Sequence, residues 1–402
     1  MREIAVMRTR DEPRAQSVLE WALSPPGVIA WSRWLPGLQR RLDRPALTDL
    51  TQVRRLGILR SDGMGDLILT TGMFRELRRQ LPDTQITFIC QKRWAAWMRT
   101  CPWIDDVVDV DETRPGWLGA PKRAWELARF ITRVWPLDFE VLLQPGTAFW
   151  YVHSRALAWF TGAPVRLCWE DSLSGVEVGG MFHTHRLAYP NAWHETEKCF
   201  RMLQAMGLEG NGRRLETWWT PDEAQRGETL ARETKRGRRT LVALGLAGSE
   251  AERRWPEPRY LTVIRDLTAR GDVAFLVFGG SDVASGCRWV AEQAGEGTSY
   301  AGENLTLGIV WAAIAQCDLY IGNDTGLMHM AAAARVPVVV VIGVPEGAPA
   351  GTRGDSTHTG PCETTARVVR PRDSVSPKPD IAAVSAEAVS AAAVDLLPGM
   401  VV

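Results

Sequence analysis

The segment Arg60–Asp66 places an arginine, two aspartates and two glycines close together. A carboxylate at a cleft can take a proton from a hydroxyl, which is the task of a general base, so Asp66 is the first candidate and Asp62 the second. Gly63 and Gly65 allow a tight turn and the close approach of a ligand. An aspartate in the first turn of a helix often only complements the helix dipole, so both interpretations of Asp66 stay open.

A second polar cluster runs from Asn323 to His329. If a helix begins here, its free backbone N–H groups and its dipole form a site for an anion such as pyrophosphate. Asp324 would repel pyrophosphate unless it faces a sugar hydroxyl or holds the loop, and it or Thr325 could simply cap the helix. His329 lies one turn inside, on the side that faces the helix start.

A third cluster joins the glycine turn Gly245–Ser249 to Arg253, Arg254 and the pair Trp255–Pro256. Either arginine can hold a phosphate through its planar guanidinium group. Proline near the first turn favours a helix that starts at this pair. A solvated charged loop is the alternative interpretation.

Each cluster follows a short apolar run and precedes an amphipathic one, which predicts alternating strands and helices. The expected strands span 56–59, 85–90, 106–110, 139–143, 165–168, 240–244, 273–278, 319–321, 336–342 and 368–369. The expected helices span 66–80, 93–100, 122–134, 154–161, 195–206, 256–270, 284–293, 305–317, 326–335 and 382–397. Such alternation predicts an α/β protein with parallel, doubly wound sheets, whose ligands bind at the carboxyl ends of the strands.

The length of 402 residues predicts two domains. We expect an N-terminal helical extension over 1–50, with helices at 15–23 and 28–42, and a first Rossmann-like domain over 51–208. A glycine-containing linker at 209–214 begins the second domain, 209–380, and a helix in 381–402 is expected to pack back toward the first domain.

The amino-acid composition excludes several classes of function. Lysine plus arginine and aspartate plus glutamate both total 47, which argues against nucleic-acid binding and limits any membrane contact to a local, peripheral patch. The seven cysteines include no C-x-x-C pair, and we read His183–His185 as a loop, so we expect no metal site. No signal peptide or membrane span is evident, which predicts a cytoplasmic protein, at most peripheral at the inner membrane.

Tryptophan is abundant, with 18 residues. Trp94, Trp97, Trp117, Trp150 and Trp159 could stack on sugar faces, although core packing is the simpler role for most of them.

The motifs together resemble glycosyltransferase family nine, the ADP-heptose transferases that build the lipopolysaccharide inner core. The resemblance rests on Arg60–Asp66 followed by Leu67–Thr71, on Arg253–Pro256, and on Asn323–Gly326 with His329, in that order and spacing. It implies the GT-B fold, with the acceptor bound by the first domain and the donor by the second. It also implies transfer with inversion and without a metal.

The resemblance assigns the general base to Asp66, and the phosphate-binding lysine of the family corresponds to Arg253. The family's ribose-binding glutamate has no clear match after Phe278–Gly280, and Asp282 is the nearest substitute. A related branch that modifies autotransporter proteins has a C-terminal cysteine cluster. This chain has only Cys362 in that region, which argues against that branch. The predicted donor-binding residues are Ser249, Arg253, Asp282, Asn323, Asp324, Thr325, Gly326 and His329, and the acceptor-side loop comprises Arg60, Asp62, Gly63 and Gly65.

The function this predicts is transfer of heptose or a related sugar from an ADP-sugar co-substrate, with no cofactor, to a glycan of the lipopolysaccharide-core type. A small-molecule acceptor in a secondary-metabolite pathway is the first alternative. A nucleotide-dependent oxidoreductase and an inactive GT-B module that only binds nucleotide sugars are the others.

Overall fold

The structure is a computed structural model that describes residues 35, 37–111, 120–146, 152–170, 182–188, 193–210, 214–248, 250–346, 358–371 and 379–397, without the side chains of 120–124 and 152–153. The expected helix at 15–23, most of the extension 1–50, Trp117, Trp150 and Ser249 lie outside these residues.

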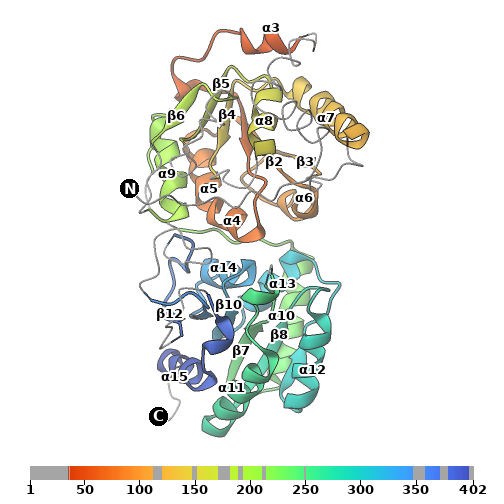
Figure 1. The fold of residues 1–402 in the computed structure, drawn as a ribbon, viewed down its shortest axis with the longest axis vertical. Helices are drawn as coiled ribbons and strands as arrows, with labels where there is room; N and C mark the ends of the chain where they lie inside the picture. Colours follow the sequence, from red (N-terminus) through yellow and green to blue (C-terminus); the bar gives the residue numbers. More distant parts are fainter. Residues whose placement is uncertain are drawn as a thin grey trace, which may run out of the picture. The chain divides into compact units, whose positions relative to one another are not determined.

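The first half of the chain forms a six-stranded sheet in the order β3-β2-β1-β4-β5-β6 (Figure 1). Its strands are β1 (Arg55–Leu59), β2 (Gln85–Gln91), β3 (Asp106–Val110), β4 (Val141–Gln144), β5 (Val165–Trp169) and β6 (His185–Leu187). Neighbours pair in parallel, as where Gly57 lies opposite Leu142. The strand order reverses between β1 and β4, and the Arg60–Asp66 loop follows β1 at this switch point, where doubly wound sheets bind ligands.

The helices of this half are α3 (Leu38–Leu42), α4 (Met64–Leu69), α5 (Thr71–Gln80), α6 (Lys92–Met98), α7 (Ala120–Val134), α8 (Val152–Phe160) and α9 (Glu195–Ala205). Short 3-10 turns lie at Leu50–Gln52 and Trp135–Leu137 in the described part of this half.

The predicted single helix at 66–80 is wrong, because two helices, α4 and α5, meet at Thr70. The Thr70 hydroxyl donates to the Asp66 carbonyl (2.9 Å) and the Thr71 hydroxyl to the Ile68 carbonyl (2.7 Å). Threonine hydroxyls that bond back to the preceding turn compete with the helical ladder and bend it. The first helix also begins earlier than predicted, at Met64, so that Asp66 lies in its first turn.

The second half forms another six-stranded parallel sheet, in the order β12-β11-β10-β7-β8-β9. Its strands are β7 (Thr240–Gly245), β8 (Val273–Phe278), β9 (Thr298–Tyr300), β10 (Leu319–Asn323), β11 (Val338–Val341) and β12 (Ala366–Val369). All residues of β8, β10 and β11 are buried, as expected of strands covered on both faces.

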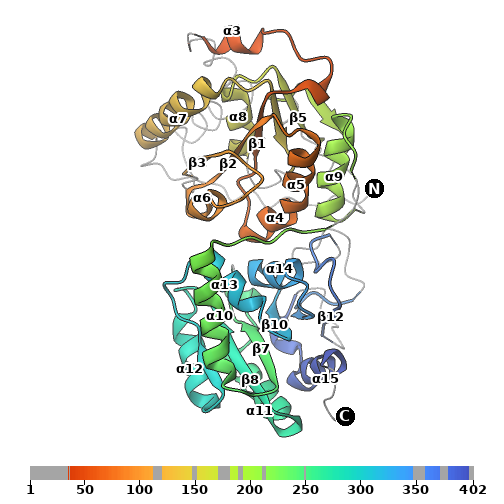
Figure 2. The same cartoon turned by 180° about the vertical axis from the view of Figure 1, so that it is seen from behind.

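Helices cover this second sheet on both faces. The helices are α10 (Pro221–Lys235), α11 (Glu257–Arg270), α12 (Ala284–Ala294), α13 (Leu307–Ile314), α14 (Gly326–Ala333) and α15 (Ala386–Leu396). Helix α10 packs on α13, and α13 on α14, while α11 packs between α12 and α15; Figure 2 shows α10 alongside α13. We expected the terminal helix to turn toward the first domain, and this stays a prediction; its main contacts in the described residues are with α11 and β10–β12.

Helix α10 is absent from the sequence prediction, although its start carries a strong signal. Thr220 accepts a hydrogen bond from the Glu223 N–H (3.3 Å), Glu223 accepts one from the Thr220 N–H (2.9 Å), and Pro221 occupies the first turn. This is a capping box with proline at its preferred position. The edge strands β6 and β9 were also missed, and His185 therefore begins a strand rather than lying in a loop. A 3-10 turn at Ile381–Ala383 precedes α15, where one continuous helix was predicted.

By its internal contacts the chain falls into two compact units, Met1–Leu59 with Pro115–Tyr189 and Arg60–Arg114 with Pro190–Val402. All three predicted ligand-binding loops belong to the second unit. The same unit contains a tryptophan cluster in which Trp97 stacks on Trp218 with ring centroids 4.9 Å apart, and Trp218 meets Trp311 at 5.4 Å. Trp97 is only 6% exposed, so core packing is its observed role.

Candidate functional site

Arg60 is the centre of the first candidate site. Its side chain is buried, and its guanidinium donates to Asp62 Oδ2 (2.9 Å), to Glu195 Oε2 (3.2 Å) and to the Thr70 hydroxyl (2.6 Å). Asp66 Oδ1 lies 3.6 Å from Arg60 Nη2, the same atom that donates to Glu195. One buried cation therefore holds three carboxylates at the end of β1.

The Asp66 carboxylate is accessible to solvent and has a raised pKa. Its side chain is 36% exposed, and Oδ2 accepts a hydrogen bond from the Gly63 N–H (3.2 Å), which fixes the carboxylate over the start of α4. Burial raises the pKa of Asp66, Arg60 opposes that rise, and the charge of Glu195 adds to it. A reachable carboxylate with a raised pKa is a stronger base than an ordinary aspartate, which suits it to accept a proton from a hydroxyl.

Glu195 and Lys198 belong to this cluster, and sequence reasoning missed both. Lys198 Nζ lies 2.7 Å from Glu195 Oε1, and both side chains are almost fully buried. Burial alone would raise the pKa of Glu195, but Arg60 and Lys198 hold it below its ordinary value. An acidic residue at a helix start resembles a simple partner for the helix dipole, so only the approach of α9 to α4 identifies it.

Asp62 should make the stability of the protein depend on pH. Burial raises the pKa of Asp62 to about 7 against the pull of Arg60. An unfolded aspartate has a pKa of about 3.9, so between about pH 4 and 7 the folded state binds the extra proton and stability falls as pH rises. We expect Asp62→Asn to remove this loss of stability. The free energy of unfolding of the variant, relative to that of wild type, should therefore increase by on the order of 2 kcal/mol between about pH 4 and about pH 7.5. Urea unfolding at both pH values tests this, and a pH-independent difference would contradict it.

Helices α4 and α14 approach each other closely through glycines. A Cβ atom on Gly65 would lie 2.5 Å from His329 Cδ2, and one on Gly326 would overlap the Met64 side chain. A side chain at position 65 would collide with the His329 ring, and one at position 326 would require the Met64 side chain to move. The approach brings the first and second predicted loops together, and the charge of Asp66 contributes to the raised pKa of Asp324.

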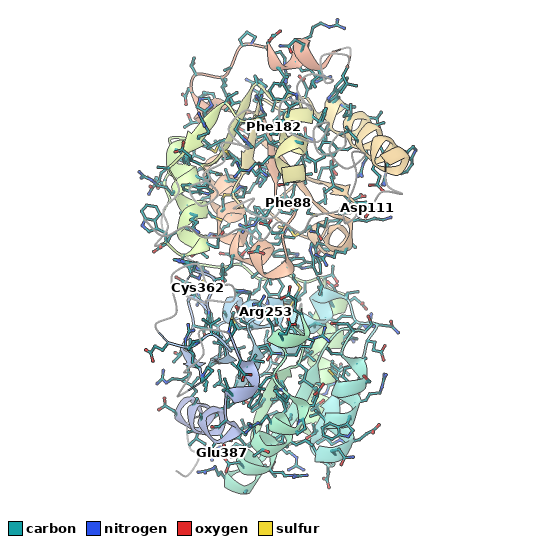
Figure 3. The ribbon with its side chains drawn as sticks, viewed as in Figure 1. Phe88, Asp111, Phe182, Arg253, Cys362 and Glu387 are labelled. Carbon is teal, nitrogen blue, oxygen red and sulfur yellow. The ribbon has the colours of Figure 1, made fainter. Side chains whose placement is uncertain are left out.

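Arg253 and Asp324 form an ion pair at the start of α14. Arg253 Nη2 lies 3.1 Å from Asp324 Oδ2 and also donates to the Asp324 carbonyl (3.2 Å). Figure 3 shows Arg253 near α14, at the carboxyl edge of the second sheet. Burial raises the pKa of Asp324 to about 6, although Arg253 opposes that rise. The pair holds the arginine beside the helix N-terminus, where an anion would bind.

Asn323 connects three loops through its side-chain amide. Its fully buried amide donates to the carbonyls of Leu246 (3.2 Å) and Ala247 (2.9 Å), and its oxygen accepts from the Trp255 N–H (3.1 Å). The side chain is thus occupied by protein groups that follow β7 and precede α11. Its role in donor binding stays a prediction. Any such effect of Asn323 would be indirect, through the loops that it positions.

His329 and Thr325 contribute uncharged polar groups. Burial lowers the pKa of His329 to about 3, so the imidazole is neutral at physiological pH. His329 Nδ1 is buried without a hydrogen-bond partner in the described part of the chain. The Thr325 hydroxyl interacts with that of Tyr320, but the two do not form a well-shaped hydrogen bond. Both groups therefore keep hydrogen-bonding capacity at the start of α14.

Asp282 pairs with the second arginine of the R-R-W-P motif. Its Oδ2 lies 2.5 Å from Arg254 Nη2, and Arg254 Nε donates to the Gly248 carbonyl (2.9 Å). The Asp282 side chain is 57% exposed, so a ligand can reach it. Its proposed substitution for the ribose-binding glutamate stays a prediction.

Two parallel, doubly wound sheets with polar loops at their carboxyl edges define the fold as GT-B, with two Rossmann-like domains, and solved structures show the same fold. A glycosyl transferase family 9 protein from Veillonella parvula covers 87% of this chain and 98% of its own, with a TM-score of 0.71 and 20% identity. The Escherichia coli heptosyltransferase WaaC with ADP covers 85% and 100%, with a TM-score of 0.64 and 16% identity. The E. coli ADP-heptose lipopolysaccharide heptosyltransferase II covers 85% and 98%, with a TM-score of 0.62 and 15% identity.

The chain belongs to glycosyltransferase family 9, the heptosyltransferase family, whose model matches residues 148–371, more than half of its length. The match includes Arg253 and the loop before α14, whereas Asp66 lies outside it. No match was found among curated protein sequences. Among the described residues, no helix is long and apolar enough to cross a bilayer.

Proposed function

We propose that this glycosyltransferase moves heptose or a related sugar from an ADP-sugar to a hydroxyl of a lipopolysaccharide-core-type glycan, with inversion and without a metal. The observation that carries the proposal is the environment of the Asp66 carboxylate. Asp66 is an accessible carboxylate with a raised pKa, and the close approach of α4 to α14 brings it near a helix N-terminus suited to bind phosphate.

The proposed reaction is a single displacement. The acceptor hydroxyl oxygen forms a bond to the anomeric carbon while Asp66 takes the hydroxyl proton, and the bond from that carbon to the diphosphate breaks. ADP leaves with the electron pair, and attack opposite to it inverts the anomeric centre. Arg253 and the free N–H groups at the start of α14 would stabilise the negative charge that grows on the diphosphate.

The donor and acceptor are proposed from the relatives. One structurally similar protein is named as a complex with ADP and another as an ADP-heptose lipopolysaccharide heptosyltransferase. A glycan acceptor of this kind would be met at the cytoplasmic face of the inner membrane. The balanced charge of 47 basic and 47 acidic residues suits the alternative, a small soluble acceptor, equally well.

Nucleotide binding is the first experiment. ADP at 100 times its Kd should stabilise the protein by about 2.7 kcal/mol, and UDP and GDP at equal concentration should stabilise it less. Arg253→Met should weaken ADP binding by about 10–100-fold, because a hydrogen bond to a charged group contributes roughly 1.5–3 kcal/mol. Arg270→Met, on the exposed part of α11, is the matched control and should bind ADP normally. Preference for UDP over ADP would overturn the proposed donor.

Transfer is the second experiment. Purified protein with ADP-heptose is offered a lipopolysaccharide-core glycan or a panel of small hydroxylated molecules, with and without EDTA, and products are identified by mass spectrometry and anomeric NMR. The proposal expects inverted product on the glycan, with EDTA having no effect. Product on small molecules only would favour the alternative acceptor, and ADP binding without transfer or hydrolysis would favour an inactive module.

A further inference from the structure

Glu195 and Asp66 share one atom of Arg60. Nη2 of the guanidinium donates to Glu195 Oε2 at 3.2 Å, whereas Asp66 Oδ1 lies at 3.6 Å, beyond a good hydrogen bond. The closer partner is the buried carboxylate, and the more distant one is the accessible carboxylate. Lys198, at 2.7 Å from the other oxygen of Glu195, keeps Glu195 ionised in this position.

This arrangement matters because a general base must not be paired too well. A carboxylate in direct contact with a buried arginine loses proton affinity, since a neighbouring opposite charge favours the ionised form. A weakened base also contributes less to proton transfer. Arg60 lies close enough to attract the Asp66 carboxylate, so Asp66 stays basic only if another group neutralises most of the charge of Arg60.

We propose that Glu195 is a positioning residue that keeps Asp66 basic by competing with it for the Arg60 guanidinium. The inference rests on the proposed role of Asp66 as the general base. Glu195 does not touch the reacting atoms; it draws the shared guanidinium nitrogen toward α9 and places a second negative charge beside Asp66. Lys198 supports this by balancing the charge of Glu195 from the far side.

Other ionisable groups face Asp66 as well. Asp62 shares Arg60 through Nε, and Asp324 and His329 approach from the loop before α14 and from α14 itself. Helix α5, which also packs on α4, directs its charged side chains elsewhere. Its arginines pair with Glu76, Glu209, Glu216 and Asp105. Glu195 is therefore the carboxylate that competes with Asp66 at the same guanidinium nitrogen.

The test is the pH dependence of kcat/KM for sugar transfer in wild type, Glu195→Gln and Glu195→Asp. In the glutamine variant Arg60 is free to pair with Asp66, so the acidic limb of the profile should move about one pH unit lower. Activity near pH 7 should fall roughly 3–10-fold, because the base is weaker. The aspartate variant keeps the charge and should restore the limb toward its wild-type position.

Glu76→Gln is the matched control. Glu76 is also a nearly buried carboxylate held by two arginines, on α5, and its replacement should leave the limb in place. If Glu195→Gln does not fold because Lys198 loses its ion pair with Glu195, the double variant Glu195→Gln with Lys198→Met removes both charges and should show the same shift.

The outcomes separate this inference from the proposed function. Activity that survives in Asp66→Asn would remove the base and the proposal with it. An inactive Asp66→Asn together with an unmoved acidic limb in Glu195→Gln would overturn the role of Glu195 and leave the base intact. A uniform loss of activity at every pH would also overturn it, because that is the effect of a purely structural residue.

Discussion

Replacing Asp66 with asparagine is expected to lower the rate of sugar transfer by about 10²–10⁴-fold, the usual contribution of a positioned base, with ADP binding retained. Asparagine keeps an oxygen that can accept from the Gly63 N–H, so the start of α4 should remain intact. It removes the negative charge beside Arg60 and, with it, the capacity to take a proton. Single-turnover transfer with ADP-heptose, together with ADP titration by calorimetry, measures the two effects separately.

Asp62→Asn is the control for this experiment. Asp62 is bound to the same arginine but is less exposed than Asp66, with 18% of its side chain accessible against 36%. We expect its replacement to change turnover far less. Near-normal transfer by Asp66→Asn would remove Asp66 from the role of base, and an equal loss in both variants would show that the cluster acts as a unit.

The regular parts of the fold could be predicted because buried strands are continuous apolar runs, and β8 and β11 are clear examples. The break at Thr70 was missed because apolar periodicity continues across it while threonine hydroxyls compete for the helical carbonyls. Helix α10 was missed because only Gly227, Ala231 and Thr234 are buried on it, which leaves little hydrophobic periodicity to detect.

The loops of the site could be located because they follow strands, but their internal connections could not. The sequence did not indicate that the Asn323 amide holds the loops after β7 and before α11, and its role in donor binding stays a prediction. The sharing of Arg60 by three carboxylates depends on the approach of α9, more than a hundred residues later in the chain. Such a contact leaves no spacing signal in a single sequence.

A second large effect is expected from Arg60→Met, this time on stability. Methionine fills much of the same volume, but Asp62, Asp66 and Glu195 lose the cation that they share. Removing one partner of a buried ion pair typically costs about 3–5 kcal/mol, because the remaining charge is left uncompensated. We expect a loss of this size in the free energy of unfolding near pH 7, measured by urea denaturation.

The sign of the pH dependence distinguishes this mechanism from simple loss of packing. Without Arg60, Asp62 and Asp66 can escape their uncompensated charge only by binding protons, whereas Glu195 keeps its ion pair with Lys198, so the deficit should be small near pH 5 and grow toward pH 8. Arg79→Met is the matched control, since Arg79 also pairs with a buried glutamate but is itself 53% exposed, and it should cost less than about 1 kcal/mol. A deficit for Arg60→Met that is equally small, or that does not change with pH, would mean that the three carboxylates are stabilised by groups other than Arg60, and the electrostatic account of the cluster would fail.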